Sequence, residues 1–315
     1  MDFNKEMIAD RQFSGQTVLV TGASGFIGSP LCRRLVAHGA DVHAVSRIDR
    51  KADFPNLRWW KGALEDYALA RDLVSRLKPR FIFHLAGNVR ATRDLDMMLP
   101  CLHGNLTTVV NVLTAATEIG CERIVLAGSM EEPEDALAVT PSSPYAAAKW
   151  AASGYARMFH ALYQTPIVNL RVFMVYGPGR QDLRKLIPYV TLALLREQIP
   201  KLSSGARPID WVYVDDVVDG LLAAARAGDL VGGTIDLGSG VPTTVAETVA
   251  HLAELIPSRA RPLLGEIGDR ALEQACVADT AQAREKLNWS AKTPLKEGLR
   301  RTVEWYAQRV QAGDI

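Results

Sequence analysis

The sequence has few cysteines and no long apolar run. Its 315 residues include Cys32, Cys101, Cys121 and Cys276, and no two of them have metal-ligand or C-x-x-C spacing. We therefore expect four reduced thiols and no metal site. The first residues lack a signal-peptide core, and no stretch approaches the roughly 20 apolar residues of a membrane span. This favours a soluble, cytoplasmic protein with no membrane partner.

An excess of charge of either sign is also missing. The 36 basic and 35 acidic residues give a formal net charge of +1, and no basic stripe is present. Nucleic-acid binding is therefore not expected. Hydrophobic residues make up 48% of the chain, which suits one large α/β domain or a domain with an appendage.

Short apolar runs alternate with helical patterns through the first half of the chain. Such alternation predicts a Rossmann-type, doubly wound parallel sheet of the α/β class. The expected strands are 16–22, 41–47, 57–62, 81–87, 123–129 and 166–177, and the expected helices are 29–39, 65–78, 105–119 and 144–163.

The second half has a looser pattern and predicts a smaller, mostly helical C-terminal lobe for the substrate. We expect a dinucleotide-binding domain at 14–173, completed by a strand, helix and strand at about 209–237. The substrate-binding lobe is then formed by 174–208 and 238–315.

A G-x-x-G-x-x-G run lies directly between the first strand and the first helix. Glycine lets the backbone approach a ligand closely, and the helix N-terminus offers free N–H groups to a pyrophosphate. The strand–turn–helix context predicts a dinucleotide site. Its expected cofactor-binding residues are Gly22, Ser24, Gly25, Phe26, Ile27 and Gly28.

The end of the second strand bears on the choice of nicotinamide cofactor. A carboxylate there suits the ribose of NAD, whereas an arginine suits the 2′-phosphate of NADP. This strand ends in Ser46 and Arg47, with Asp49 beyond. We predict NADP, with NAD as the alternative, because a hydroxyl and a guanidinium can both bind phosphate.

Three side chains form a candidate catalytic set. Tyr145 and Lys149 are four apart at the start of a helix, so they share one face. Ser129 ends the fifth strand, where parallel sheets bind ligands. A neighbouring ammonium favours the phenolate of a tyrosine, which can then exchange a proton with a substrate oxygen.

These motifs resemble those of the extended short-chain dehydrogenase/reductases, especially the nucleotide-sugar epimerase, dehydratase and reductase group. The similar segments include TGASGFIG, HLAG, PYAAAK, RVFMVYGPG and DWVYVDDVV. The resemblance implies that Asn105 supports a proton relay and that subunits pair as a homodimer through helices 105–119 and 145–163. It also implies that the cofactor is lined by Leu85, Ala86 and Gly87, with adenine met by the backbone of Leu64.

The chain departs from that family at positions that bear on the reaction. Met130 replaces the acid of the dehydratases, and a thioether cannot protonate a leaving hydroxyl; Glu131 is retained. Met174 stands where a substrate-binding asparagine is usual, and Arg207 could replace an arginine that is missing at Ile209. Glu131, Met174 and Arg207 are therefore candidate substrate contacts.

The sequence favours an NADP-dependent 4-ketoreductase of a nucleotide-activated sugar, with Tyr145 as the proton donor, Ser129 orienting the oxygen, and Lys149 lowering the Tyr145 pKa and binding ribose. Three alternatives stay open. One is an NAD-retaining nucleotide-sugar 4-epimerase or decarboxylase. Another is a reductase of a non-sugar carbonyl, and the last is a catalytically silent cofactor sensor, which the intact catalytic set disfavours.

Overall fold

The computed structural model describes residues 12–133, 140–269, 272 and 275–315. The chain divides into two compact units. The first runs to Arg171 and also contains Leu221–Ile235, and the second contains Val172–Gly220 and Asp236–Ile315. The first residues, where no signal peptide is expected, lie mostly outside the described ranges. Within those ranges, no helix is long and apolar enough to cross a bilayer.

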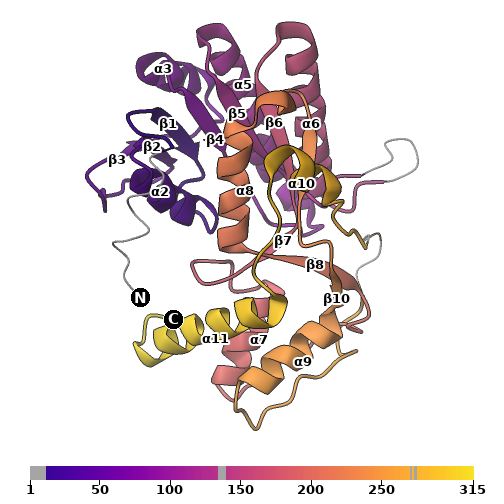
Figure 1. Ribbon diagram of the computed structural model, residues 1–315. Coiled ribbons are helices and arrows are strands. Elements are labelled where there is room, and N and C mark those ends of the chain that lie inside the picture. Colours follow the sequence, from indigo (N-terminus) through magenta and orange to yellow (C-terminus); the bar gives the residue numbers. More distant parts are fainter. Residues whose placement is uncertain (1–11, 134–139, 270–271, 273–274) are drawn as a thin grey trace. The chain divides into compact units, whose positions relative to one another are not determined.

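A seven-stranded sheet forms the centre of the first unit, and it confirms the predicted Rossmann-type architecture. Its order is β3-β2-β1-β4-β5-β6-β9, so the direction of winding reverses between β1 and β4 (Figure 1). The pairs β1–β2, β1–β4, β2–β3 and β4–β5 are parallel. The strands are β1 (Thr17–Thr21), β2 (Asp41–Ser46), β3 (Leu57–Lys61), β4 (Phe81–His84), β5 (Arg123–Ser129), β6 (Ile167–Val172) and β9 (Thr234–Leu237).

Helices cover both faces of this sheet. Apolar side chains of α3 (Tyr67–Leu77), α5 (Thr108–Ile119) and α6 (Pro144–Tyr163) join strand residues in one buried cluster. Figure 1 shows α2 (Gly28–Ala37) on the other side of the sheet, and α8 (Val214–Arg226) is divided between the two units. The side chain of Ser143 caps α6, and Pro144 occupies its first turn, a favoured start for a helix.

The helix predicted at 105–119 begins further upstream than expected. A short 3₁₀ turn (Leu95–Met97), α4 (Met98–Cys101) and a π-helical segment (Leu102–Thr107) lead into α5. π-Helical turns occur frequently at functional sites. This one contains Asn105, a predicted site residue.

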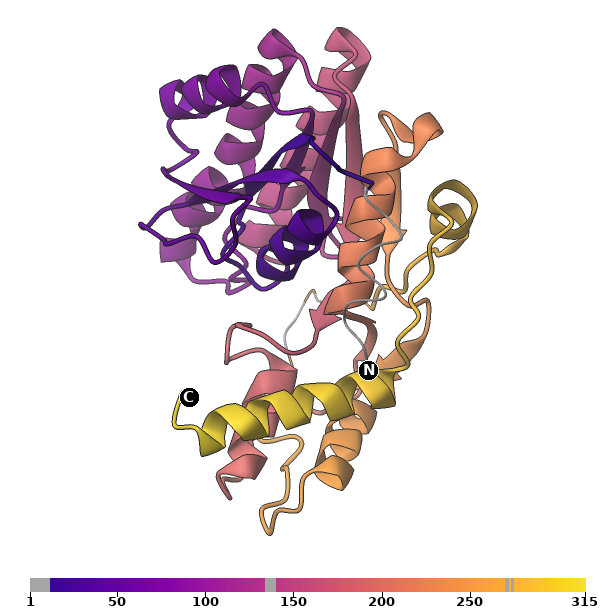
Figure 2. The same ribbon diagram turned by 60° about the vertical axis from the view of Figure 1, so that its left-hand side comes forward.

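The second unit has its own small sheet and core. The sheet has the order β10-β8-β7, formed by β10 (Pro242–Thr244), β8 (Pro208–Tyr213) and β7 (Met174–Tyr176). Helices α7 (Leu186–Leu195), α9 (Val245–Leu255) and α11 (Leu295–Gln311) pack against one another (Figure 2), and α10 (Ala281–Leu287) precedes α11. Tyr176 and Trp211 meet edge to face in this core, with ring centroids 6.0 Å apart.

Two sequence predictions are wrong here. The run 166–177 is not one strand, because it breaks at Phe173, whose N–H donates to the oxygen of Leu237. Its first part extends the large sheet and its second part pairs with β8 in the small sheet. The strand predicted from residue 209 likewise does not complete the dinucleotide-binding domain. It is β8, whose partners are β7 and β10, and residues 209–220 belong to the second unit.

A buried carboxylate organises the loops around β8. Asp210 Oδ1 accepts from the N–H and the hydroxyl of Ser239, at 2.7 and 2.6 Å. Its Oδ2 accepts from the N–H groups of Gly240 and Ala278, at 2.9 and 3.0 Å. One side chain therefore satisfies four donors from two separate segments, which explains why a carboxylate is stable in this buried position.

Candidate active site

The glycine turn between β1 and α2 is built on close backbone approaches. Gly22 has a φ of 65°, and a Cβ there would lie 2.6 Å from the carbonyl carbon of Leu85. The N–H of Gly25 donates to the oxygen of Gly22 at 2.9 Å, and a Cβ at Gly28 would overlap that same oxygen. Glycine is therefore required here for turn geometry and for contact with the end of β4.

The start of α2 suits a phosphate ligand. No side chain caps the helix at Ile27, and no acidic residue occupies its first turn. Gly25 is exposed in the turn before it. A helix N-terminus with free N–H groups and no competing carboxylate favours a bound anion. The residues of the turn thus fit the pyrophosphate of a dinucleotide.

The end of β4 lies beside this turn. The N–H of Leu85 donates to the oxygen of Thr21 at 3.3 Å, and the N–H of Ala86 donates to the Thr21 hydroxyl at 3.1 Å. The same hydroxyl hydrogen-bonds to His84 Nδ1 at 3.0 Å. Leu85 and Ala86 are therefore held next to Gly22, as expected for residues that line a cofactor.

The end of β2 presents basic groups. Ser46 is buried, and its hydroxyl accepts from Arg50 Nε at 3.4 Å, while Arg47 is exposed. Asp49, the nearest acid, forms an ion pair of 2.7 Å with Lys61. The one carboxylate that could bind a ribose hydroxyl in this segment is thus engaged by a lysine.

The three predicted catalytic residues come together. Ser129 is buried at the end of β5, and its side chain lies close enough to Tyr145, in the first turn of α6, to influence the pKa of the phenol. Lys149 follows one turn later, is buried, and donates from Nζ to the oxygen of Ala127 at 2.7 Å. Two hydroxyl groups and an ammonium can act together on a substrate oxygen.

Burial dominates the electrostatics of this set. It raises the pKa of Tyr145; the hydrogen bond from Ser129 opposes this, while the carboxylates of Glu131 and Glu132 add to it. Burial also lowers the pKa of Lys149, and the carboxylate of Glu132 opposes that shift. Desolvation of the phenolate is therefore the larger effect on Tyr145, and a lowering of its pKa by Lys149 stays a prediction.

Asn105 lies close to the catalytic set. It is fully buried, and its Nδ2 donates to the oxygens of Asn88 and Cys101, each at 3.1 Å. A Cβ at Gly87 would lie 2.5 Å from Asn105 Oδ1 and 3.8 Å from Lys149 Nζ. The structure therefore brings Gly87, Asn105 and Lys149 together, and the relay role of Asn105 stays a prediction.

The remaining predicted residues of the first unit have mixed surroundings. Leu64 is buried, and its carbonyl already accepts from Asn111 Nδ2 at 2.9 Å. Met130, which stands where dehydratases have an acid, is buried. Glu131 lies in the turn after Ser129: its N–H donates to the Ser129 hydroxyl at 3.2 Å, and its Oε2 accepts from the Ser143 hydroxyl at 3.4 Å.

The two other candidate substrate contacts belong to the second unit. Met174 in β7 packs against the apolar core of that unit. Arg207 directly precedes β8, and its carbonyl accepts from the N–H of Val245 at 3.0 Å. Ile209, where the usual arginine is missing, is buried in the same core. Substrate contacts of Met174 and Arg207 stay predictions.

Sequence reasoning missed Glu132. This side chain is buried directly behind Ser129, and its Oε1 accepts from the Ser129 N–H at 2.7 Å. In the sequence it is the second of two adjacent glutamates and shows no pattern of its own. Only the turn that follows β5 directs it inward.

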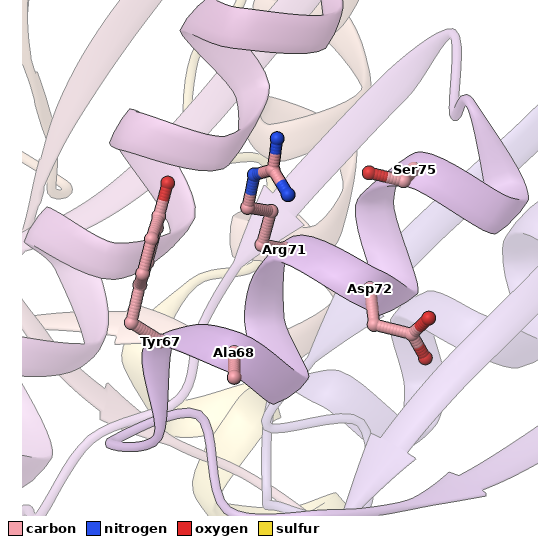
Figure 3. A pocket seen from close by; sticks show the side chains of 5 residues that line it. All are labelled: Tyr67, Ala68, Arg71, Asp72 and Ser75. Carbon is pink, nitrogen blue, oxygen red and sulfur yellow. The ribbon is translucent and has the colours of Figure 1, made fainter.

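A surface depression lies on α3, away from this set (Figure 3). It is lined by Tyr67, Ala68, Arg71, Asp72 and Ser75. The hydroxyl of Tyr67 and the Nε of Arg71 both donate to Glu118 of α5, at 2.9 and 2.8 Å. None of the predicted site residues contributes to this depression. Tyr67 and Arg71 are engaged with α5, and Asp72 accepts from Arg76 Nε of its own helix at 2.8 Å.

Comparison with known proteins agrees with this site. The profile of the NAD dependent epimerase/dehydratase family matches residues 18–238, which include the glycine turn, Ser129, Tyr145 and Lys149. The chain belongs to this family. Members are enzymes of the extended short-chain dehydrogenase/reductase type, which confirms the resemblance inferred from the motifs.

The relatives in this family are mainly epimerases and dehydratases. The UDP-glucose 4-epimerase of Mycolicibacterium smegmatis is 32% identical, over 93% of this chain and 99% of that protein. The dTDP-glucose 4,6-dehydratase of Neisseria gonorrhoeae is 28% identical, over 92% and 95%. MoeE5, solved with UDP-glucuronic acid and NAD, is 31% identical with a TM-score of 0.83, over 93% and 99%.

Proposed function

We propose that the protein is a nucleotide-sugar 4-epimerase that retains NAD. The main support for this proposal is that Ser129, Tyr145 and Lys149 lie together in a chain that is 32% identical to a UDP-glucose 4-epimerase. MoeE5, which also resembles this chain over its whole length, was solved with UDP-glucose and NAD. Within this proposal the first unit binds the dinucleotide and the second unit binds the sugar nucleotide.

The chemistry follows from the positions of the hydroxyl groups. A bound nicotinamide supplies the acceptor and later the donor of a hydride. Tyr145 removes the proton of the C4 hydroxyl and returns it after the keto sugar has presented its other face. Ser129, which lies beside Tyr145, orients the same oxygen. Lys149 holds a positive charge near the phenol, and Asn105 supports the relay. Met130 offers no proton for dehydration, which disfavours that branch of the family reactions.

The test uses purified protein and defined sugar nucleotides. We expect release of NAD on denaturation, and formation of the C4 epimer from UDP-glucose or UDP-glucuronic acid, read by NMR. Tyr145→Phe should lower kcat by about 10² to 10⁴ while NAD binding is unchanged. Tyr163→Phe is the matched control, because that residue is exposed on the same helix. Equal activity of the Tyr145 variant and the wild type would refute the mechanism.

A second candidate is the NADP-dependent 4-ketoreductase that the sequence favours. The basic end of β2 supports it, because Arg47 is exposed beside Ser46 while Asp49 is paired with Lys61. Net oxidation of NADPH by a 4-keto sugar nucleotide, together with no retained NAD, would favour this reading over epimerisation. Absence of any thermal shift with a panel of nucleotide diphosphates would favour a non-sugar carbonyl substrate instead.

We also propose a homodimer formed through the helical region 95–119 and α6. Large apolar side chains are exposed on these segments, and water-exposed apolar patches favour association. They include Leu95, Leu99, Leu102, Tyr155, Leu162 and Tyr163. Sedimentation should give twice the chain mass, and Leu162→Glu should shift the protein toward a monomer.

A further inference from the structure

A buried carboxylate lies behind the catalytic set. Glu132 is 6% exposed, and its N–H donates to the oxygen of Ser129 at 3.1 Å, which closes a tight turn after β5. Gly128 makes room for it, because a Cβ there would lie 2.7 Å from Glu132 Oε1. The backbone and the neighbouring glycine together admit a side chain of this length.

The contacts of Glu132 place a hydrogen-bond donor at each of its two oxygens. Its Oε1 accepts from the Ser129 N–H at 2.7 Å, and its Oε2 accepts from the Ser153 hydroxyl at 2.5 Å. The Ser153 oxygen is in turn engaged by Asn169 Nδ2 at 3.0 Å. Both carboxylate oxygens therefore face donors, an arrangement that favours the charged form. Burial opposes it by raising the pKa of Glu132, and the positive charges of Lys149 and Arg171 restore it in part.

The charge of Glu132 acts on the residues of α6. Ser153, which bonds to it, stands four residues after Lys149 and therefore shares a helix face with it. The charged and titratable groups around this point are Lys149 and Tyr145 on α6, Arg171 on β6, Glu131 in the same turn, His84 on β4 and Cys101 on α4. Lys149 is buried, and Glu132 is the carboxylate whose charge counters that burial.

We propose that Glu132 is a positioning residue of the active site: it fixes the backbone of Ser129 and is the buried counter-charge that keeps Lys149 an ammonium. The inference rests on the proposed proton-transfer role of Ser129, Tyr145 and Lys149. Removal of a negative charge disfavours every proton-bound state of the groups around it. The protons of the Tyr145–Lys149 pair should then be lost at lower pH, whichever residue releases its proton first.

The test measures Lys149 directly and needs no substrate. Competitive acetylation of the folded protein across a pH series, read by mass spectrometry on the Lys149 peptide, gives the midpoint for loss of its proton. Glu132→Gln keeps the shape and removes the charge, so the midpoint should fall by about one pH unit. Glu118→Gln, which removes an exposed carboxylate on α5, should leave it unchanged. An unchanged midpoint in the Glu132 variant overturns the proposal.

A second variant separates charge from shape. Glu132→Asp retains the charge one methylene further back, so its midpoint should lie between those of the wild type and the glutamine variant. If the glutamine variant does not fold, Glu132→Asp is the only variant needed. A Lys149 midpoint equal to that of the wild type then counts against the proposal.

Turnover distinguishes this proposal from the proposed function. Where an epimer is formed, the pH profile of kcat should move in Glu132→Gln by a shift of the same sign, an effect that loss of packing alone would not cause. A shifted Lys149 midpoint with no turnover of any sugar nucleotide sinks the proposed function and leaves the counter-charge role intact.

Discussion

Replacing Gly22 by alanine should damage both folding and cofactor binding, and Gly15 provides a control that separates the causes. The two glycines have almost the same backbone angle, with φ values of 65° and 68°. They differ in surroundings: a Cβ at Gly22 would lie 2.6 Å from the carbonyl of Leu85, whereas a Cβ at Gly15 would meet nothing within 4 Å. The left-handed conformation costs alanine about 1 kcal/mol at either position.

The overlap at Gly22 adds a second cost. The obstacle is backbone rather than a flexible side chain, so relief requires β1 and the end of β4 to move apart. Overpacking of this kind costs about 2 kcal/mol beyond the conformational term. We therefore expect Gly22→Ala to lower the free energy of unfolding by about 3 kcal/mol and Gly15→Ala by about 1 kcal/mol.

Urea unfolding of the NAD-free proteins measures the first effect, and calorimetric titration of the NAD-free proteins with NAD measures the second. Because Leu85 and Ala86 are expected to line the cofactor, their displacement should weaken NAD binding about tenfold in the Gly22 variant. Binding by the Gly15 variant should match the wild type. Equal losses of stability in the two variants would show that the close approach to β4 contributes nothing, and the reasoning would fail.

Two further predictions concern buried polar groups. Asp210→Asn places an amide against the N–H donors of Gly240 and Ala278 and should cost about 3 kcal/mol in urea unfolding, whereas Asp269→Asn, at an exposed acceptor, should cost less than about 1 kcal/mol. Burial lowers the pKa of His84 to about 3, so the unfolded chain takes up a proton below pH 6.5 and the folded protein does not. Between pH 7 and 5 the wild type should therefore lose about 2 kcal/mol more than His84→Gln, and identical pH dependence of the two proteins would contradict this.

Local patterns explain the parts of the fold that the sequence predicts well. The turn at Gly22–Gly28 requires glycine for steric reasons, and those reasons can be inferred from residue type and position alone. The Tyr145 and Lys149 pair depends only on helical spacing, and the helix begins at the expected Pro144. Features of this kind need no knowledge of distant contacts, so they are visible in one sequence.

The sequence predictions fail where pairing with a residue far along the chain determines the bounds of a strand. The run 166–177 is mostly apolar, and both of its halves are strands, so no periodicity marks the break at Phe173. The break exists because Leu237 and Trp211 are the partners on either side of it, and both lie far along the chain. The short strand β10 escaped prediction for the same reason, since pairing with β8 defines it.

The site shows the same division in its chemistry. The hydroxyls and the ammonium of the catalytic set follow from residue type and position, but their pKa values do not, because burial decides them. Burial raises the pKa of Tyr145 and lowers that of Lys149, so a phenolate–ammonium pair is disfavoured in both of its members. Lys149 could stabilise the phenolate of Tyr145 by itself only if Lys149 kept its proton despite burial.

The residues along helix α6 explain how Lys149 can keep its charge despite burial. Tyr145, Lys149 and Ser153 follow one another at intervals of four residues, so a single face carries the proton donor, the ammonium and the group that binds Glu132. Ser129 lies between the two ends, since its hydroxyl is beside Tyr145 and its N–H donates to Glu132 Oε1 at 2.7 Å. Through these contacts the carboxylate that stabilises the ammonium also fixes the serine, and the geometry and the charge of the site are therefore set by the same buried residue.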